Sequence, residues 1–178
     1  ISCGFKKSQL IKLSLFDYLH LSIPEKRKSK NLPIIIAGNL LPTKSGYIYK
    51  LEDINKKIKF NLYGPNYDET KSFNFLNYCG QYSPEELPKH LSGSFGLVWD
   101  GDSIETCSGN TGNYLKYNSP HKLSLYLASG LPIIIWSQAA MASFVKEHCL
   151  GLVVDNLYQI EEKIQKLSDN KYNEMLNN

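Results

Sequence analysis

Short apolar runs that recur along the chain constrain its fold more than any other feature of the sequence. Residues 32–37, 95–99 and 132–136 are almost wholly apolar, and turn residues follow each run. Strands that are buried on both faces read in this way, whereas a strand with one face in water alternates apolar and polar residues. Stretches with helical spacing of apolar residues separate the runs. The sequence therefore predicts an α/β fold built on a doubly wound parallel sheet.

Apolar periodicity and turn residues also place the individual elements. Further strands are expected over residues 58–63, 75–80 and 152–154. Helices are expected over residues 45–55, 83–91, 120–129, 138–147 and 160–167, with Gly130 just beyond the end of the third. Residues 101–119 show no periodicity and predict a long loop, and loops of this length are usually functional or disordered.

The length of 178 residues fits one ordinary domain. Residues 1–30 differ from the rest, because apolar and polar residues alternate over 11–15 and predict a half-buried strand. We expect residues 1–30 to be a connector or the remnant of a preceding N-terminal domain, and residues 31–178 to form the domain that carries the site. The chain starts with Ile1 rather than Met, which suggests a processed or excised piece.

Charge and composition exclude several classes of function. The formal net charge is only +3, and the single dense basic cluster spans residues 26–30, so nucleic acid binding is not expected. This mild positive charge fits an anionic ligand or membrane lipids. No apolar run reaches the ~18–20 residues of a membrane-spanning helix, and no signal peptide is visible. The cysteines form no C-x-x-C pair, which predicts free thiols in a reducing cytoplasm and no zinc site.

Familiar catalytic signatures are missing from the sequence. It has no G-x-S-x-G elbow, no Walker P-loop and no G-x-G-x-x-G after the first strand, which disfavours classical dinucleotide and P-loop enzymes. Asp100, Asp102 and Glu105 follow a predicted strand, where paired carboxylates can act as acid and base or bind a metal. Such residues also cap turns, so both interpretations stay open. His121 is a candidate for a phosphate contact or for an acid.

Three turns at the carboxyl ends of predicted strands carry the candidate site, because ligands of an open parallel sheet bind there. In the strongest, a helix with Pro120 at its first position leaves the amides of residues 121 and 122 free. The helix dipole and the Lys122 ammonium add positive charge, which favours a phosphate or diphosphate. The alternative is that Asn118 or Ser119 simply caps the helix and that Lys122 is solvated.

The other two turns give weaker signals. Gly38 and Asn39 follow the first strand, with Lys44 shortly beyond, and a glycine there lets the backbone approach a ligand closely. Residues 81–83 follow the third strand, where backbone groups and the Tyr82 ring can meet a base or a sugar. An ordinary turn and an ordinary capped helix start are the alternatives.

In this order along the chain, the three turns resemble the C-terminal, nucleotide-sugar-binding half of GT-B glycosyltransferases, a Rossmann-like domain. Residues 118–133 hold the most specific likeness, a Pro-x-Lys-Leu followed by a tyrosine and a run of the form Ala-x-Gly-x-Pro. Gly38, Leu40 and Lys44 are similar to the Gly-Arg-Leu turn and following lysine of that fold. Together with Phe16-Asp17-Tyr18, these stretches most resemble bacterial β-1,6-galactofuranosyltransferases and the glucosyltransferases that extend sugar on serine-rich adhesins.

This resemblance implies roles for residues of all three turns. Lys122 and the amides near His121 would bind the diphosphate of a UDP-sugar, the first turn would line the phosphate and sugar, and the third would hold the uracil. The implied donor-binding residues are Gly38, Asn39, Lys44, Gln81, Tyr82, Ser83, Asn118, Pro120, His121 and Lys122. Two positions depart from the pattern: Leu125 replaces a glutamate that contacts ribose, and Asn39 replaces an arginine. Ribose contacts would then come from elsewhere, such as residues 101–119.

The resemblance also implies the reaction. A hexosyl group, namely galactofuranose, glucose or galactose, would pass from a UDP-sugar to a cell-surface glycan or glycoprotein, with no metal or other cofactor. Positive groups and helix amides would stabilise the departing UDP, and the main catalytic group would lie in the missing N-terminal domain. A UDP-sugar epimerase and a non-catalytic assembly module are the alternatives. A cytoplasmic protein is expected; association with the inner face of the membrane and a homo-oligomer are left open.

Overall fold

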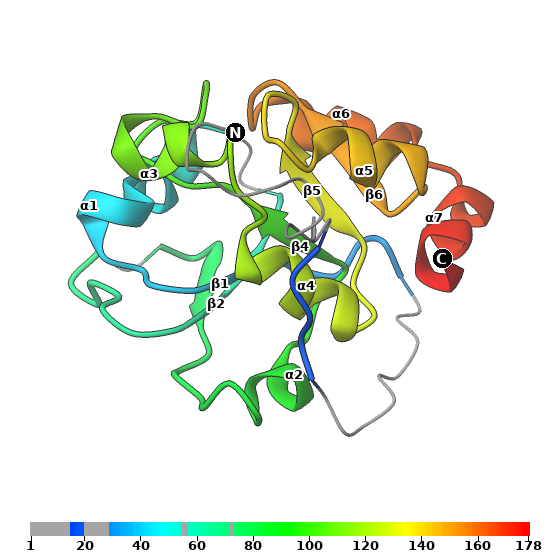
Figure 1. Ribbon diagram of the computed structural model, residues 1–178. Helices are drawn as coiled ribbons and strands as arrows, with labels where there is room; N and C mark the ends of the chain where they lie inside the picture. Colours follow the sequence, from blue (N-terminus) through cyan, green and yellow to red (C-terminus); the bar gives the residue numbers. More distant parts are fainter. Residues whose placement is uncertain (1–14, 20–28, 55–56, 72) are drawn as a thin grey trace, which may run out of the picture.

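A six-stranded parallel sheet with helices on both faces forms the centre of the protein (Figure 1). The computed structural model describes residues 15–19, 29–54, 57–71 and 73–178. The strands follow the order β3-β2-β1-β4-β5-β6 across the sheet. They are β1 (Ile34–Ala37), β2 (Phe60–Tyr63), β3 (Leu76–Tyr78), β4 (Phe95–Val98), β5 (Ile133–Trp136) and β6 (Gly151–Val154). The order reverses between β1 and β4, so the predicted doubly wound fold is confirmed.

Every residue of β1, β2, β4 and β5 is buried, which explains why β1, β4 and β5 read as unbroken apolar runs; β2 is interrupted by Asn61, whose amide donates to the Ser92 carbonyl at 2.6 Å. The edge strand β3 is partly exposed, and its sequence is correspondingly more polar. The strand predicted over residues 11–15 and the basic cluster over residues 26–30 lie mostly outside the described residues. No helix in the described ranges is both long enough and apolar enough to cross a membrane.

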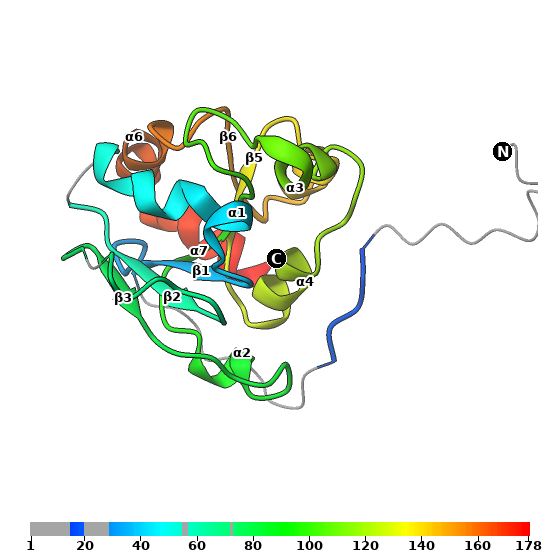
Figure 2. The ribbon, with the colours of Figure 1, turned by 90° about the vertical axis from the view of Figure 1, so that its left-hand side faces the viewer.

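The helices divide between the two faces of the sheet. In Figure 2, α6 lies on one side of the sheet while α2 and α4 lie on the other. The helices are α1 (Pro42–Ser45), α2 (Leu87–His90), α3 (Gly109–Tyr114), α4 (His121–Ala128), α5 (Ala142–Glu147), α6 (Gln159–Lys166) and α7 (Asp169–Asn177), with a 3-10 helix η2 (Gly46–Asp53) after α1. The crossover from β4 through α4 to β5 places the start of α4 beside the point where the strand order reverses.

Close packing of α4 on β4 fixes the start of the helix. A Cβ placed at Gly96 of β4 would lie 2.2 Å from Cγ of Tyr126, so only glycine lets this ring contact the strand. The ring spans the sheet surface, and its hydroxyl accepts the Ala37 N–H of β1 at 2.7 Å. Burial raises the pKa of Tyr126, which keeps this hydroxyl neutral. One tyrosine therefore ties α4 to the two strands that flank the switch point.

Several predicted helices are shorter than expected. Most of the stretch 45–55 is the 3-10 helix η2, and the short helix α1 ends where the stretch begins; of 83–91 only Leu87–His90 is α-helical. The first residues of 138–147 form a turn, so α5 starts at Ala142. In the first two stretches, Gly46 begins η2 and Pro88 lies in the first turn of α2. Glycine and proline disfavour a longer regular α-helix, so turns form part of both stretches.

Besides α1, two helices were not expected from periodicity. The predicted loop 101–119 contains α3, where Gly112 packs so tightly that a Cβ would lie 2.8 Å from the Asp100 carbonyl oxygen. This helix is set by contacts with distant residues rather than by apolar spacing. The second is α7, which Ser168 caps by accepting the Lys171 N–H, and whose Tyr172 hydroxyl donates to the Ser94 carbonyl at 2.9 Å.

Candidate functional site

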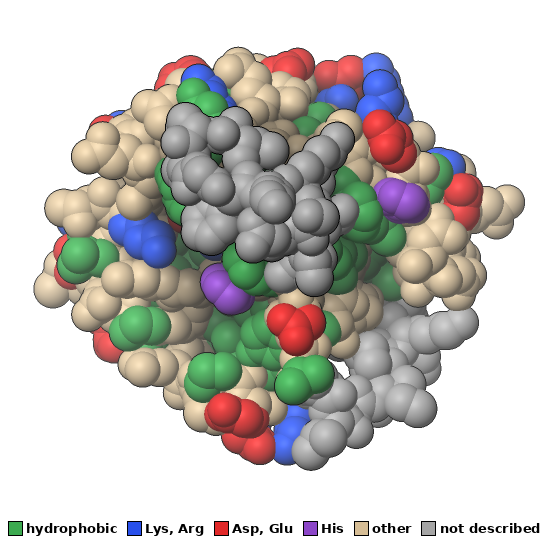
Figure 3. All heavy atoms as spheres, in the orientation of Figure 1, with side chains coloured by type: hydrophobic (Ala, Val, Ile, Leu, Met, Phe, Trp, Pro, Cys, Tyr) green, Lys and Arg blue, Asp and Glu red, His purple; other side chains and the backbone are tan. Residues whose placement is uncertain are grey.

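A cavity of about 550 Å³ lies where the carboxyl ends of β1 and β4 diverge. This is the switch point, at which open α/β sheets bind their ligands. Figure 3 shows hydrophobic side chains gathered on the face that carries α2 and α4. The cavity is lined by Tyr18, Ala37, Gly38, Lys44, Tyr82, Pro84, Leu87, Asp100, Thr111, Tyr114, Asn118, Pro120, His121, Lys122 and Leu125. Residues from all three predicted turns therefore meet in one cavity.

The N-terminus of α4 opens into this cavity. Pro120 is the N-cap, with ψ of 138°, rather than the first helical residue that the sequence predicted. The Leu123 N–H is bonded to the Pro120 carbonyl at 2.9 Å, which leaves the His121 and Lys122 amides at the helix end. Among the described residues no side chain caps this terminus. Such an end, with the helix dipole behind it, favours an anion.

The capping role considered for Asn118 and Ser119 is not found in the structure. Asn118 lines the cavity instead. Its Oδ1 and the Ser119 Oγ are buried and have no hydrogen-bond partner in the described part of the chain. Buried polar atoms without a partner are costly, so Asn118 Oδ1, which lies in a cavity-lining residue, marks a place where a bound group would add a hydrogen bond.

Lys122 is not solvated, so that alternative is wrong. Its ammonium donates to Asp100 Oδ1 at 2.8 Å and to the Trp99 carbonyl at 3.1 Å. The side chains of Lys122 and Asp100 are only 14% and 9% exposed. The ammonium is thus folded back against the carboxyl end of β4, inside the cavity wall. Sequence reasoning placed Asp100 at a strand end but did not predict this ion pair.

Two of the three residues predicted in the turn after β1 line the cavity. Gly38 lines the cavity at φ of 140°, and a Cβ there would meet no atom within 4 Å, so its backbone faces open space. Lys44 also lines the cavity. Asn39 does not, because its Oδ1 accepts the Leu41 N–H and the Asn66 amide, both at 3.0 Å.

Backbone bonds join this turn to the end of β4. The Gly101 N–H donates to the Lys44 carbonyl at 2.8 Å, and the Tyr47 N–H donates to the Gly101 carbonyl at 3.2 Å. These bonds hold Lys44 beside the residue that follows Asp100. The two lysines that line the cavity, Lys44 and Lys122, therefore come from segments that both adjoin the end of β4.

Of the donor-binding residues predicted in the turn after β3, only one lines the cavity, and Pro84 at the end of the same turn lines it as well. Tyr82 does so, and its ring stacks on His90 with centroids 3.8 Å apart. Gln81 and Ser83 are exposed and are not among the lining residues. The Ser83 carbonyl accepts the Leu87 N–H at 2.9 Å, so this residue serves the turn that leads into α2.

The N-terminal segment 15–19 lies at the mouth of the cavity, which the sequence did not predict. The Phe16 ring stacks on His121 with centroids 4.8 Å apart. The Tyr18 hydroxyl donates to the Pro84 carbonyl at 2.5 Å, and burial raises the pKa of Tyr18. Thr111 and Tyr114 of α3 complete the wall. The sequence marked these residues only through the family resemblance and the unassigned segment 101–119, and their place in the cavity wall follows from the fold.

The acidic residues after β4 do not form a catalytic pair. Asp102 accepts a hydrogen bond from Ser108 and Glu105 accepts one from Ser103, and these bonds lower the pKa of both exposed carboxylates. Neither lines the cavity, so the turn-capping interpretation applies to them. The described residues contain no group of three or more histidine, cysteine, aspartate or glutamate side chains that could bind a metal ion.

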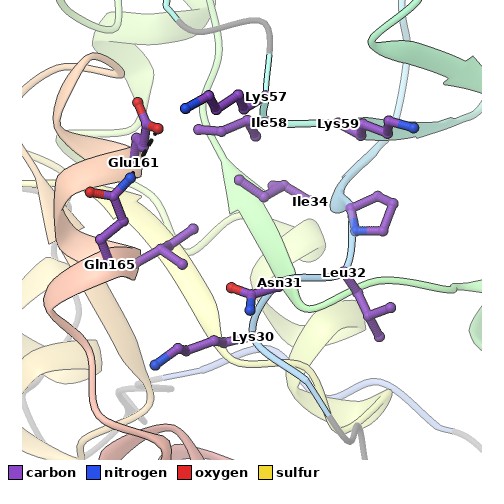
Figure 4. A pocket seen from close by; sticks show the side chains of 11 residues that line it. Lys30, Asn31, Leu32, Ile34, Lys57, Ile58, Lys59, Glu161 and Gln165 are labelled. Carbon is purple, nitrogen blue, oxygen red and sulfur yellow. Dashed lines mark hydrogen bonds between the residues drawn. The ribbon is translucent and has the colours of Figure 1, made fainter.

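A second cavity, of about 460 Å³, lies at the opposite edge of the sheet, where β1 and β2 begin (Figure 4). Lys30, Lys57 and Lys59 surround it together with Glu161 and Gln165 of α6. None of the predicted site residues lies there. The amino ends of parallel strands are not where such sheets bind ligands.

The sheet order and the cavity together define a Rossmann-like domain with an uncapped helix N-terminus at its switch point. The model of the family "Glucosyltransferase 3-like, C-terminal domain" matches residues 34–178, and the chain belongs to this family. It is 38% identical over 169 residues to the β-1,6-galactofuranosyltransferase WbbI of Escherichia coli strain K12, covering 93% of this chain and 49% of WbbI. The chain is also 33% identical over 116 residues to glucosyltransferase 3 of Streptococcus gordonii, covering 65% of this chain and 34% of that protein.

The chain thus spans half or less of the length of these curated relatives. Among solved structures it resembles a point mutant of S. aureus TarM in complex with fondaparinux, α-GlcNAc-glycerol and UDP, with a TM-score of 0.59 and 14% identity over 96% of this chain and 36% of that one. A second TarM structure gives a TM-score of 0.50 at 13% identity, covering 91% of this chain and 32% of that one. The expected resemblance to GT-B glycosyltransferases of the galactofuranosyl- and glucosyltransferase group is confirmed.

Proposed function

We propose that this chain is the donor-binding part of a UDP-sugar-dependent hexosyltransferase. The observation that supports it best is the cavity at the switch point, where the open end of α4 and the side chains of Lys44 and Lys122 meet. Amides, helix dipole and ammonium groups together suit a diphosphate. The relatives named as a galactofuranosyltransferase and a glucosyltransferase support sugar transfer as the reaction.

In this proposal the cavity stabilises the leaving group. The bond from the anomeric carbon of the sugar to the β-phosphate oxygen breaks, an acceptor oxygen bonds to the anomeric carbon and loses its proton, and UDP takes the extra negative charge. The α4 amides and Lys122 lie where that charge develops, which is the electrostatic form of catalysis. Because the α4 amides and Lys122 would stabilise the charge of the leaving UDP, we propose that the transfer needs no metal ion.

The donor's other groups have candidates in the same wall. Tyr82 offers a ring to the uracil. Leu125 is an apolar part of the wall where other GT-B enzymes have a carboxylate for ribose. Thr111 and Tyr114 of α3 are therefore the groups we assign to the ribose hydroxyls, and both come from the segment 101–119.

We further propose that residues 31–178 form the donor domain, that 1–30 connect it to another domain, and that this other domain supplies the acceptor site and the main catalytic group. The acceptor would be a cell-surface glycan or glycoprotein. A cytoplasmic location, with access to the inner face of the membrane, fits a UDP-sugar donor. The partial length relative to the curated relatives supports this division of labour.

Isothermal titration of the chain with UDP tests the proposal. We expect saturable binding, and we expect Lys122→Ala to weaken it by about tenfold or more, since a charge-assisted hydrogen bond contributes about 1.5–3 kcal/mol. Lys166→Ala on α6 is the matched control, because this lysine is exposed and pairs with Glu162 away from the cavity. A folded chain that shows no heat of binding with UDP would refute the assignment.

A further inference from the structure

Asp100 holds the ammonium group on which the proposed donor site depends. It lies two residues after the end of β4 and is 7% exposed, and it lines the cavity together with Lys122 from the start of α4. The Nζ–Oδ1 distance of 2.8 Å makes this a hydrogen-bonded ion pair. Both side chains are largely withdrawn from water, so the two charges act on each other more strongly than a surface pair would.

Two buried groups near this carboxylate, Tyr47 and Cys107, are neutral. Tyr47 is fully buried, and burial together with the negative charge of Asp100 raises its pKa. Burial likewise raises the pKa of Cys107 to about 12. Among the described residues, Lys122 is the only ion-pair partner of Asp100. The Tyr47 hydroxyl, which has no hydrogen-bond partner in the described part of the chain, is not a substitute for that positive charge.

The hydrogen bonds that the Lys122 ammonium already makes limit what it can donate to a ligand. A lysine has three N–H donors, and here Asp100 and the Trp99 carbonyl take two of them. A phosphate oxygen that approaches Lys122 therefore meets one remaining donor and a carboxylate close behind it. The negative charges of the phosphate and of the Asp100 carboxylate repel each other, so Asp100 weakens the binding of an anion to Lys122.

We propose that Asp100 is a positioning residue that fixes Lys122 against β4 and competes with the donor diphosphate for its ammonium. The inference rests on the proposed function of the cavity. It follows that Asp100 lowers the affinity for the product UDP, since the carboxylate restores its ion pair with Lys122 as UDP leaves.

Titration of wild-type chain and Asp100→Asn with UDP and with uridine tests this proposal. Asparagine keeps the size of the side chain and removes its charge. We expect UDP to bind at least about threefold more tightly to the variant, because one negative charge beside the phosphates is gone. Uridine carries no phosphate, so its affinity should stay within about twofold. A merely structural role for Asp100 would weaken the binding of both ligands.

Three further variants make the test decisive. Asp100→Ser, which is also neutral, should bind UDP more tightly as well, and it replaces asparagine if that variant does not fold. Asp100→Glu restores the charge and should return the affinity close to that of wild type. In a Lys122→Ala background, Asp100→Asn should not change UDP affinity by the same factor as in the wild-type background, because residues in contact are coupled; an equal change would show that Asp100 acts on the phosphates without Lys122.

The outcomes separate this inference from the proposed function. If the wild-type chain binds UDP but neither neutral variant binds it more tightly, the competing role of Asp100 is wrong and the donor site stands. If wild type binds UDP and Lys122→Ala binds it equally well, the ammonium does not serve the diphosphate and the inference is again wrong. If the folded wild-type chain does not bind UDP, both fail.

Discussion

At the scale of the residue, the chemistry of the cavity depends on which charges the fold pairs. Lys122 can be found from the sequence, because it stands in the first turn of a helix after a strand. Its partner Asp100 cannot, since twenty-two positions separate them and an aspartate after a strand more often belongs to a turn. Tyr18 and Thr111 likewise line the cavity although they lie far apart in the sequence.

Cys107 gives a residue-scale prediction for stability. Burial raises its thiol pKa from 9.0 to about 12. An unfolded chain loses this proton at lower pH than the native chain, so the stabilisation is complete below about pH 9 and is lost as pH rises toward 12. We expect the free energy of unfolding to fall by about 1.4 kcal/mol per pH unit from this group alone.

Urea denaturation between pH 8 and pH 10.5 measures this slope. The buried tyrosines add to the fall above about pH 10, so the range just above pH 9 isolates the thiol. Cys107→Ala should flatten the curve in that range, whereas an unchanged slope in this variant would show that the thiol is not the titrating group. Cys79, which is partly exposed, supplies the matched control as Cys79→Ala.

At the scale of the element, the position of α4 depends on a contact that no local pattern reveals. Its apolar spacing and the glycine after its end predict a helix over 120–129, and α4 covers most of that range. Nothing in that stretch says which strand it crosses. The missing side chain at Gly96 and the Tyr126 hydroxyl on the Ala37 N–H decide this, and they direct the helix end toward the switch point.

We therefore expect Gly96→Ala to destabilise the fold. The added methyl would overlap the Tyr126 ring, and overpacking of a filled core costs about 1–3 kcal/mol. Chemical denaturation followed by circular dichroism measures the loss. In a Tyr126→Leu background the same alanine should cost clearly less, because residues in contact are coupled; an equal cost in both backgrounds would contradict the packing argument.

At the scale of the whole molecule, the described residues form a six-stranded doubly wound sheet with a cavity at its switch point, while the chain spans half or less of its curated relatives. We expect the isolated chain to bind UDP without transferring sugar, because the proposed acceptor site and catalytic group belong to another domain.

Thermal unfolding and product analysis check both parts of this expectation. Saturating UDP should raise the Tm, since a ligand that binds only the native state stabilises it. Incubation with UDP-glucose or UDP-galactofuranose and a glycan acceptor should yield no transferred sugar. Transfer by the isolated chain would contradict the division of labour, and release of an isomerised UDP-sugar would favour the epimerase alternative.

By itself, the sequence determined the fold class, the order of the strands along the chain, the open helix end at Pro120 and the candidate lysines, because each of these depends on local periodicity, capping or a short motif. The tertiary structure alone decided which of the candidates share a cavity: it brought in Tyr18, Thr111 and Asp100 and left out Asn39, Gln81 and Ser83. The reason is physical. Helix and strand periods are set by neighbouring residues, whereas the pairing of a buried charge is set by side chains that meet only after the sheet has assembled.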